Sequence, residues 1–323
     1  MSILNSQWDT RKIGNAVIIG SVNIDIAGRS HQPPKPSDSN PGKISYSSGG
    51  VGRNIAHNLA LLGVDISLIS AVGNDVYGDN IVKTTAQIGV DMTRVMRFDG
   101  ENTSTYLSVL DEHGEMVIAI NDMDIVRRID ETMIASHMDA IKAANIVVVD
   151  CNLEQTSLDW LLNQKDLPTI FVDTVSAHKC TKIQNLLANI NTLKPNLLEA
   201  QTLSNIAFHQ PDDALKIADW FHEQGLQNLV LSAGQLGVFY SEKNGANGWL
   251  PIIKTDIVNV TGAGDAMMAG LVACKLQNMP LPKAVHFAQG CASMALMSPF
   301  TNNPDLSFKN VLNLLELSHV YDA

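Results

Sequence analysis

The chain has no apolar run long enough to cross a membrane. Its longest runs, such as Ala16–Gly20, fall far short of the roughly 20 residues that a bilayer demands. The segment Met1–Lys12 also lacks the apolar core of a signal peptide. These two absences predict a cytoplasmic protein with no membrane partner.

Cysteine is scarce as well. The four cysteines are Cys151, Cys180, Cys274 and Cys291. They form no CxxC pair and no Cys/His pair at metal-ligand spacing, so buried reduced thiols are expected rather than disulfides or a zinc site.

Positive charge is the third shortage. The chain has 22 Lys and Arg residues against 33 Asp and Glu residues, a formal net charge of −11. Nucleic acid is therefore not an expected partner, because such binding depends on clustered cations. A phosphorylated ligand remains compatible, since backbone N–H groups at a helix start can bind phosphate.

What the chain does have is a regular alternation of apolar runs and helical stretches. At 323 residues and 45% hydrophobic it can bury a large core. The alternation predicts βαβ units, and hence a mostly parallel sheet flanked by helices. The expected strands are Ala16–Gly20, Ile66–Ala71, Asn145–Asp150, Pro168–Val172, Thr192–Leu193 and Leu229–Leu231. The expected helices include Leu59–Leu62, Leu158–Leu162, Ala214–Phe221, Asp265–Leu276 and one after Asn303.

Two segments interrupt this rhythm. Ala27–Ser47 is rich in Pro, Ser and Asn, and Ser104–Asn121 alternates apolar and polar residues on either side of a turn, which predicts a hairpin. We therefore predict a small β-sheet lid formed by residues 27–47 and 104–121. The α/β domain would comprise residues 1–26, 48–103 and 122–323.

The motif Asn259–Asp265 carries the strongest chemical signal. Its glycines precede a helical stretch, so that backbone N–H groups and the helix dipole can converge on an anion beside the Asp265 carboxylate. Phosphoryl transfer needs this combination, because donors neutralise the migrating group while a base takes the proton of the attacking hydroxyl. The alternative is a Gly-rich turn in which Asp265 caps the helix.

Two motifs near the start of the chain are suited to a polyol. Gly49–Asn54 precedes a helix, where glycines let a ligand approach the backbone and Asn54 can bond sugar hydroxyls. Asn23 and Asp25 follow the first strand, where open α/β sheets bind ligands. A capped turn for the first motif and a strand-end carboxylate for the second are the structural alternatives.

Two further motifs fit a nucleotide. Ser232–Gly237 follows an expected strand, where its glycines would admit a nucleotide, and an ordinary hairpin is the alternative. Asn196 and Glu199 are three residues apart, on one helical face, and could hold a hydrated Mg²⁺ and its phosphates. A solvated helix start is the alternative for that pair.

Taken in order, these motifs resemble the ribokinase (PfkB) family along nearly the whole chain. The resemblance implies a Rossmann-like α/β fold of the ribokinase type with a β-lid, kinase activity on a sugar or nucleoside, and ATP and Mg²⁺ as cofactors. It also implies that Asp265 is the catalytic base, beside an anion hole at Gly262, Ala263 and Gly264. It assigns ATP binding to Asn196, Ser232, Gly234, Gly237, Thr261 and Gly264, and metal binding to Glu199.

Within the family, stretches such as Asp38–Ile44 in the lid and Gly100–Ser104 at its border with the α/β domain resemble those of the bacterial pseudouridine kinases. This implies phosphorylation of the 5′-hydroxyl of pseudouridine. The residues that would hold the nucleoside are Asn23, Asp25, Asn40, Gly50, Asn54, Thr105 and Lys179, with a plain surface lysine as the alternative for the last.

Other features of the family concern ions and assembly. Many members carry Asp where this chain has Asn259, and that carboxylate helps to bind an activating K⁺, so the substitution puts K⁺ activation in question. Members often dimerise through the lid, which implies a homodimer.

Three other functions compete with this interpretation. A kinase of ribose or of another nucleoside would share the core and differ in the lid, and a non-catalytic nucleoside-binding protein could use the same fold. A nicotinamide-dependent oxidoreductase is disfavoured, because Gly20-Ser21-Val22-Asn23 stands where a GxGxxG motif would follow the first strand.

Overall fold

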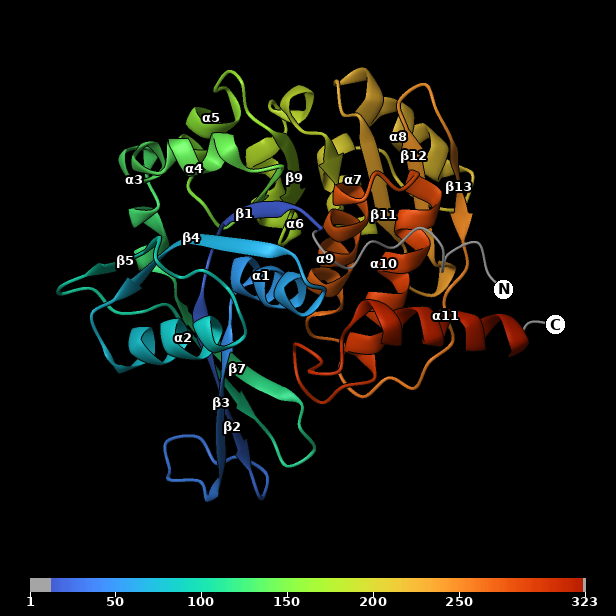
Figure 1. Ribbon diagram of the computed structural model, residues 1–323. Coiled ribbons are helices and arrows are strands. Elements are labelled where there is room, and N and C mark those ends of the chain that lie inside the picture. Colours follow the sequence, from blue (N-terminus) through green and yellow to red (C-terminus); the bar gives the residue numbers. More distant parts are fainter. Residues whose placement is uncertain (1–12, 322–323) are drawn as a thin grey trace.

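The computed structural model describes residues 13–321, which form a large α/β body with a small sheet projecting from it (Figure 1). The body is built on a nine-stranded sheet in the order β13-β12-β11-β10-β9-β8-β1-β4-β5. Its strands are β1 (Asn15–Ile19), β4 (Asp65–Gly73), β5 (Val95–Phe98), β8 (Ile146–Asp150), β9 (Thr169–Asp173), β10 (Thr192–Leu193), β11 (Asn228–Ser232), β12 (Val238–Glu242) and β13 (Asn247–Leu250). All pairings from β5 to β11 are parallel, and β12 and β13 add antiparallel strands at one edge. The predicted mostly parallel sheet is confirmed.

Helices cover both faces of this sheet. One face carries α1 (Val51–Leu61), α2 (Val76–Gln87), α9 (Ala263–Leu276), α10 (Leu281–Leu296) and α11 (Phe308–Tyr321). The other carries α3 (Glu131–Ser136), α4 (Met138–Ala143), α5 (Gln155–Leu162), α6 (Ala177–Cys180), α7 (Leu197–Ser204) and α8 (Asp213–Glu223). Short 3-10 turns join them at η1 (Asp124–Arg128), η2 (Thr181–Ile183), η3 (Leu187–Asn189) and η4 (Gly234–Leu236).

The burial pattern explains why the strands of the main sheet are continuous apolar runs in the sequence. Along β1, Ile18 packs into the cluster beneath α1 and α9, while Val17 and Ile19 pack into the cluster on the opposite face. Successive strand side chains point to opposite faces, so a strand covered on both sides must be apolar at every position. The sequence signal for these strands is therefore local and strong.

The small sheet consists of β2 (Asn23–Ser30), β3 (Gly42–Gly49), β6 (Thr105–Leu110) and β7 (Met116–Asp122), in the order β3-β2-β6-β7. The outer pairs are antiparallel hairpins, whereas β2 and β6 run parallel at the centre. The predicted hairpin in Ser104–Asn121 is present. The β2 strand already begins at Asn23, inside the range 1–26 that the sequence placed in the α/β domain.

Several parallel strands end at the same edge of the main sheet. At this edge lie Ser21 after β1, Asp150 in β8, Asp173 in β9 and Lys194 after β10. The base of the small sheet emerges there too, because β2 follows directly on Ser21 and Val22. Ligands of open α/β sheets bind beyond the carboxyl ends of the strands, so this edge is where a site is expected.

Two sequence expectations concern the remaining chemistry of the chain. All four cysteines are buried and free. Within residues 13–321, no helix combines the length and apolar character that spanning a membrane requires. The segment Met1–Lys12, on which the prediction about a signal peptide rests, lies outside the described residues.

Candidate active site

The N-terminus of α9 has the geometry of an anion site. Gly262 precedes the helix with φ +84°, and a side chain there would collide with the carbonyl of Thr301. No side chain of the described residues caps the helix, so its first N–H groups, which have no intrahelical acceptor, stay available. Asp265 lies in the first turn. The sequence motif thus forms an uncapped helix start with a carboxylate beside it, and the alternative in which Asp265 caps the helix is wrong.

The Asp265 carboxylate faces the start of α1. The side-chain amide of Asn54 donates to Asp265 Oδ2 at 2.8 Å, across 211 residues of sequence. Burial and the nearby Asp173 carboxylate raise the pKa of Asp265 to about 7, although Asn54, Lys194 and Arg53 oppose this rise. A carboxyl group with this pKa can accept a proton near neutral pH and also release it again.

Lys194 lies beneath the anion site, and sequence reasoning did not identify it. Its Nζ is 3.3 Å from Asp173 Oδ2, both side chains are buried, and it lies 3.5 Å from where a Cβ on Gly264 would be. Burial disfavours its charge, but the carboxylates of Asp173, Asp265 and Glu199 raise the pKa of Lys194. A fixed cation therefore stands under the first turn of α9. The only sequence signal was its position directly after an expected strand.

A second group of predicted residues meets at the base of the small sheet. The amide of Asn23 donates to Asp25 Oδ1 at 2.6 Å. A side chain on Gly49 would collide with the Asp25 carboxylate, and one on Gly50 would come within 2.5 Å of Ser21 O and Val22 Cα. The glycines thus bring the backbone against these polar groups. Burial raises the pKa of Asp25, which the Asn23 hydrogen bond and the Arg53 charge partly offset.

Asp150 fixes the backbone where the small sheet joins the main sheet. Its buried carboxylate accepts the backbone N–H groups of Ser21 at 2.8 Å, Gly52 at 3.0 Å and Asn152 at 2.9 Å. The network continues to Lys179, whose Nζ donates to Asn152 Oδ1. Lys179 is half-buried at the edge of the site rather than a free surface lysine. It lies where the carboxyl ends of β1, β8 and β9 meet.

A cavity of about 320 Å³ borders the N-terminus of α9 on its other side. Its wall includes five of the six residues predicted to bind ATP, namely Asn196, Ser232, Gly234, Gly237 and Gly264. The rest of the wall is largely apolar, with residues such as Val238, Ile252, Met267 and Leu296. An apolar wall of this kind suits a planar nucleobase, while the polar residues lie toward the start of α9. Ser232–Gly237 also forms the β11–β12 hairpin that was the alternative for this motif. Nucleotide binding by the motif stays a prediction.

Comparison with known proteins agrees with this geometry. A family model described as pfkB family carbohydrate kinase matches residues 14–307. The chain belongs to the pfkB family of carbohydrate kinases. It is 53% identical over 300 residues to the pseudouridine kinase of Escherichia coli K12, covering 93% of this chain and 96% of that protein.

Two solved structures share the fold of this pfkB-family kinase. A carbohydrate kinase from Agrobacterium tumefaciens is 26% identical with a TM-score of 0.83, over 94% of this chain and 97% of that one. The ribokinase of Arabidopsis thaliana, solved with ribose and ATP, is 20% identical with a TM-score of 0.82, over 94% and 99% of the two chains. The latter likeness concerns the fold alone.

In this kinase, Asn196 and Glu199 form a capping box at the start of α7. The two Glu199 oxygens accept the Asn196 backbone N–H at 2.8 Å, its side-chain amide at 2.9 Å and the Thr174 hydroxyl at 2.6 Å. Glu199 is buried whereas Asn196 is exposed, so the solvated helix start considered from sequence holds for Asn196 but not for Glu199. Among residues 13–321, no group of three or more His, Cys, Asp or Glu side chains is arranged to hold a metal ion.

Two predicted residues of the kinase, Asn40 and Thr105, are not brought to this site, and Thr261 lies beside the anion site but outside the cavity. Asn40 uses its side chain within its own loop, with bonds to Lys35 and Asp38. It lies beyond the Ser30–Gly42 pair, about 23 Å along the strands from Asn23 at roughly 3.3 Å per residue. Thr261 is exposed before Gly262 and lies outside the wall of the cavity.

Thr105 is the second residue that is not brought to the site. It pairs with Ile24, whereas Tyr106 pairs with Asp25. Paired residues share a face and neighbours alternate, so Thr105 points to the face opposite Asp25 and Tyr106 shares the Asp25 face. The sequence placed Thr105 on β6 but did not fix which face of that strand it occupies, and a substrate contact from β6 stays a prediction.

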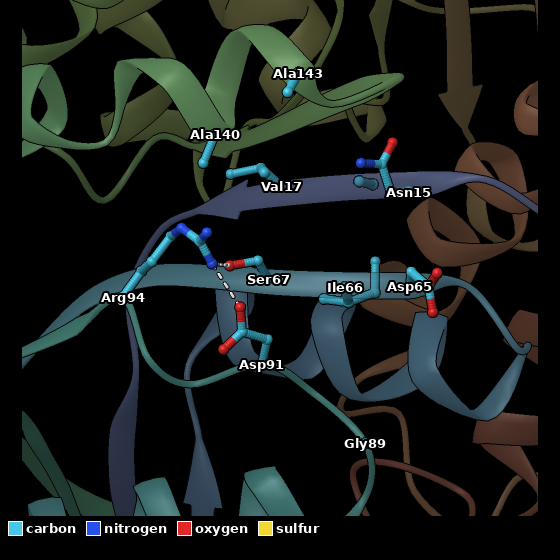
Figure 2. Close-up of a pocket in the computed structure, with 11 residues that line it drawn as sticks. Asn15, Val17, Asp65, Ile66, Ser67, Gly89, Asp91, Arg94, Ala140 and Ala143 are labelled. Atoms are coloured by element: carbon cyan, nitrogen blue, oxygen red, sulfur yellow. Dashed lines mark hydrogen bonds and ion pairs between the residues drawn. The ribbon is translucent and has the colours of Figure 1, made fainter.

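A second cavity of about 440 Å³ lies at the amino ends of β1 and β4, at the opposite end of the sheet (Figure 2). Within it, Arg94 Nη1 donates to Asp91 Oδ2 at 2.5 Å and to Ser67 Oγ at 2.9 Å. The charge of Arg94 is thus already paired, and none of the predicted site residues of the kinase lines this cavity.

Proposed function

We propose that this kinase transfers the γ-phosphoryl group of ATP to the 5′-hydroxyl of pseudouridine. One observation carries the proposal: Asp265 meets Asn54 at 2.8 Å, where the uncapped start of α9 adjoins the base of the small sheet. A hydroxyl placed there would have a base on one side and an anion site on the other. The identity of 53% with the E. coli pseudouridine kinase supports the choice of nucleoside.

In this mechanism Asp265 accepts the proton of the 5′-hydroxyl as its oxygen attacks the γ-phosphorus. The new O–P bond forms while the P–O bond to ADP breaks. The N–H groups of Ala263 and Gly264 stabilise the equatorial oxygens of the migrating group, and the buried charge of Lys194 adds to this from below. The pKa of about 7 lets Asp265 act as a base without strongly retaining the proton.

The nucleoside would lie against the base of the small sheet. Asn23, Asp25 and Asn54 present amide and carboxylate groups that match vicinal ribose hydroxyls, and Gly50 lets the ribose approach the backbone. Lys179 stays a proposed contact at the edge of this site. The roles of Asn40 and Thr105 in reading the base stay predictions that this conformation does not favour.

ATP would place its base in the cavity of about 320 Å³. Gln289 lines this cavity and is buried, and its amide donates to Pro251 O at 3.0 Å. Because only its Nε2 can donate to that carbonyl, Oε1 is left as an acceptor, without a partner among the described residues. An acceptor there suits the 6-amino group of adenine.

Magnesium would accompany ATP. Both Glu199 oxygens already accept hydrogen bonds from the protein, so direct coordination by this carboxylate does not fit the structure. Mg²⁺ commonly keeps several waters and binds chiefly through substrate phosphates, which needs no protein cage. Asn196 and Glu199 would then organise the start of α7 near the phosphates. We place this reaction in the cytoplasm, where ATP is supplied.

The small sheet also supports a homodimer. Its register puts Ile44, Tyr46, Leu107, Ile118 and Ile120 on the face opposite Asp25, and all five are exposed. A continuous apolar face of this kind is typical of an interface. We propose that a second copy of the chain covers it, because a mainly apolar face is complementary to itself in a twofold dimer.

The dimer is tested by measuring the mass in solution by sedimentation equilibrium. The wild type should have twice the 35.0 kDa mass of the chain, and Ile120→Glu should shift it toward the monomer. Leu215→Glu is the control, since Leu215 is exposed on α8, which covers the opposite face of the main sheet. A monomeric wild type would overturn the proposal.

The catalytic proposal is tested by ADP release with MgATP and a panel of pseudouridine, uridine, adenosine, ribose and fructose 6-phosphate. We expect turnover with pseudouridine far above that with the others. In Asp265→Asn turnover should fall by at least the ~10²–10⁴-fold typical of general-base catalysis. Near-wild-type turnover in this variant would overturn the assignment of Asp265 as base. Preference for another member of the panel would overturn pseudouridine as the substrate.

A further inference from the structure

Arg53 is a buried cation that pairs with no carboxylate among the described residues. Its side chain is 3% exposed on the first turn of α1. No carboxylate among the described residues forms an ion pair with it, although Asp25 and Asp265 both act on its charge at longer range. Burying an unpaired charge costs free energy, so the guanidinium needs neutral hydrogen-bond acceptors to compensate for its lost hydration.

Its hydrogen bonds are all made to neutral groups that shape the site. Nε donates to Gly49 O at 3.0 Å, and Nη1 bonds to His57 Nδ1 at 3.1 Å. Nη2 donates both to Asn54 Oδ1 and to Asn302 Oδ1, the latter at 2.8 Å. One planar group thus ties the glycine turn, two positions of α1 and a loop from the far end of the chain.

This arrangement fixes the orientation of the Asn54 amide. A guanidinium carries only donors, so the Asn54 atom that faces it must be the carbonyl oxygen. The NH₂ group is then directed the other way, where it donates to Asp265 Oδ2 at 2.8 Å. Without Arg53, the amide could turn its oxygen toward the carboxylate and repel it.

Asn302 secures the same unit from the other side. Its amide donates to Asn54 O at 3.1 Å and to Asn58 Oδ1 at 3.0 Å, and the residue is buried. The preceding residue, Thr301, packs its carbonyl against Gly262. The loop therefore links α1, which carries the substrate contacts, to the anion site at the start of α9.

We propose that Arg53 is a positioning residue for the transfer reaction, which holds the Asn54 amide toward Asp265 with Asn302 as its anchor. The inference rests on the proposed role of Asp265 as base. Arg53 touches neither substrate nor the reacting atoms in this proposal. It acts through Asn54 and through its charge.

Its charge adds to the geometric effect. Burial and Asp173 raise the pKa of Asp265, whereas Asn54, Lys194 and Arg53 lower it. Burial lowers the pKa of Arg53 to about 10, so Arg53 stays charged at neutral pH. Burial and Arg53 together lower the pKa of His57 to about 4, so this neighbour stays neutral and does not compete.

The deciding experiment is the pH profile of kcat/KM for pseudouridine in Arg53→Met. Losing the cation should raise the pKa of Asp265, so the acid limb should move to higher pH by about one pH unit. We expect kcat to fall at least tenfold while the KM for ATP changes little, since the ATP cavity does not include Arg53. Arg127→Met removes an exposed arginine and should leave all these values unchanged.

Arg53→Lys separates charge from geometry. The lysine keeps the positive charge but cannot donate to Gly49, Asn54 and Asn302 at once, so the acid limb should stay near its wild-type position while kcat still falls. Should Arg53→Met fail to fold, wild-type kcat in Arg53→Lys would by itself overturn the proposal. An unmoved acid limb in folded Arg53→Met would also overturn it.

Asp265→Asn distinguishes a failure of the proposed catalytic base from a failure of the proposed role of Arg53. If Asp265→Asn is inactive and the acid limb of Arg53→Met does not move, only the role of Arg53 fails. If Asp265→Asn remains active, the proposed base fails, whatever the result with Arg53.

Discussion

Replacing Gly50 by alanine should uncouple α1 from the strand end that it packs against. Gly50 has φ +95°, and an added Cβ would lie 2.5 Å from both Ser21 O and Val22 Cα. These are backbone atoms, so they cannot swing aside as a side chain could. Restoring ordinary contact distances requires α1 or the β1–β2 connection to move by roughly 0.8 Å.

The magnitude follows from the two costs. A positive φ costs an alanine about 1–2 kcal/mol, and the forced shift adds about 1–3 kcal/mol, as overpacking does in a close-packed core. The same shift moves Asn54 relative to Asp265. Because a misplacement of about 1 Å can cost on the order of 10²-fold in rate, kcat with pseudouridine should fall by about that factor.

Gly89→Ala is the matched control. Gly89 has φ +104°, but a Cβ there would meet nothing within 4 Å among the described atoms. It should therefore lose only the 1–2 kcal/mol of backbone strain, again as an order of magnitude, and keep its kcat. Urea unfolding and steady-state ADP release measure the two quantities. If Gly50→Ala and Gly89→Ala have the same kcat, the argument that Gly50 sets the position of α1 is refuted.

Three further predictions concern charges at the site. Because the pKa of Asp265 is about 7 in the folded state, well above the 3.8 of an unperturbed aspartate, folding favours its protonated form, and its ionisation costs stability as pH rises through that range. Thermal unfolding should therefore show Asp265→Asn to be more stable than the wild type at pH 8, by about 4 kcal/mol. The gap should shrink to under about 2 kcal/mol at pH 5 and close only below pH 4, and an equal gap at pH 8 and pH 5 would contradict this. Lys194→Met leaves Asp173 buried and unpaired, so urea unfolding should show a loss of about 3–5 kcal/mol, and adding Asp173→Asn should restore part of the stability but not the ADP release. Asn259 joins two loops by donating to Pro299 O at 3.4 Å and accepting the Thr261 N–H at 3.0 Å. The wild type should therefore turn over equally in K⁺ and in tetramethylammonium, whereas Asn259→Asp should become dependent on K⁺. Strong K⁺ activation of the wild type would contradict this role for the amide.

The sequence by itself determined the elements and the order of the motifs. Strands buried on both faces must be apolar throughout, so β1, β4, β8 and β9 were predicted almost to their ends. Glycines at positive φ before a helix give a local signal as well, which is why Gly262 and Asp265 were identified as a unit. The hairpin in Ser104–Asn121 followed from alternation around a turn in the same way.

Sequence did not decide which face of a strand meets the ligand, or what lies beneath a helix. Thr105 and Tyr106 are neighbours in the chain, and only the pairing of β6 with β2 places Tyr106 on the Asp25 face. Lys194 looked like a residue between a strand and a helix, and only the approach of Gly264 at the start of α9 makes it a cation under the anion site.

The longest-range contacts were decided by the tertiary structure alone. Asn54 reaches Asp265 across 211 residues, and Arg53 reaches Asn302 across 249. Periodicity and turn chemistry report only on interactions within a few residues, so they can mark each of these side chains as polar and well placed. The partner of each depends on how α1, α9 and the loop after α10 pack over the same end of the sheet.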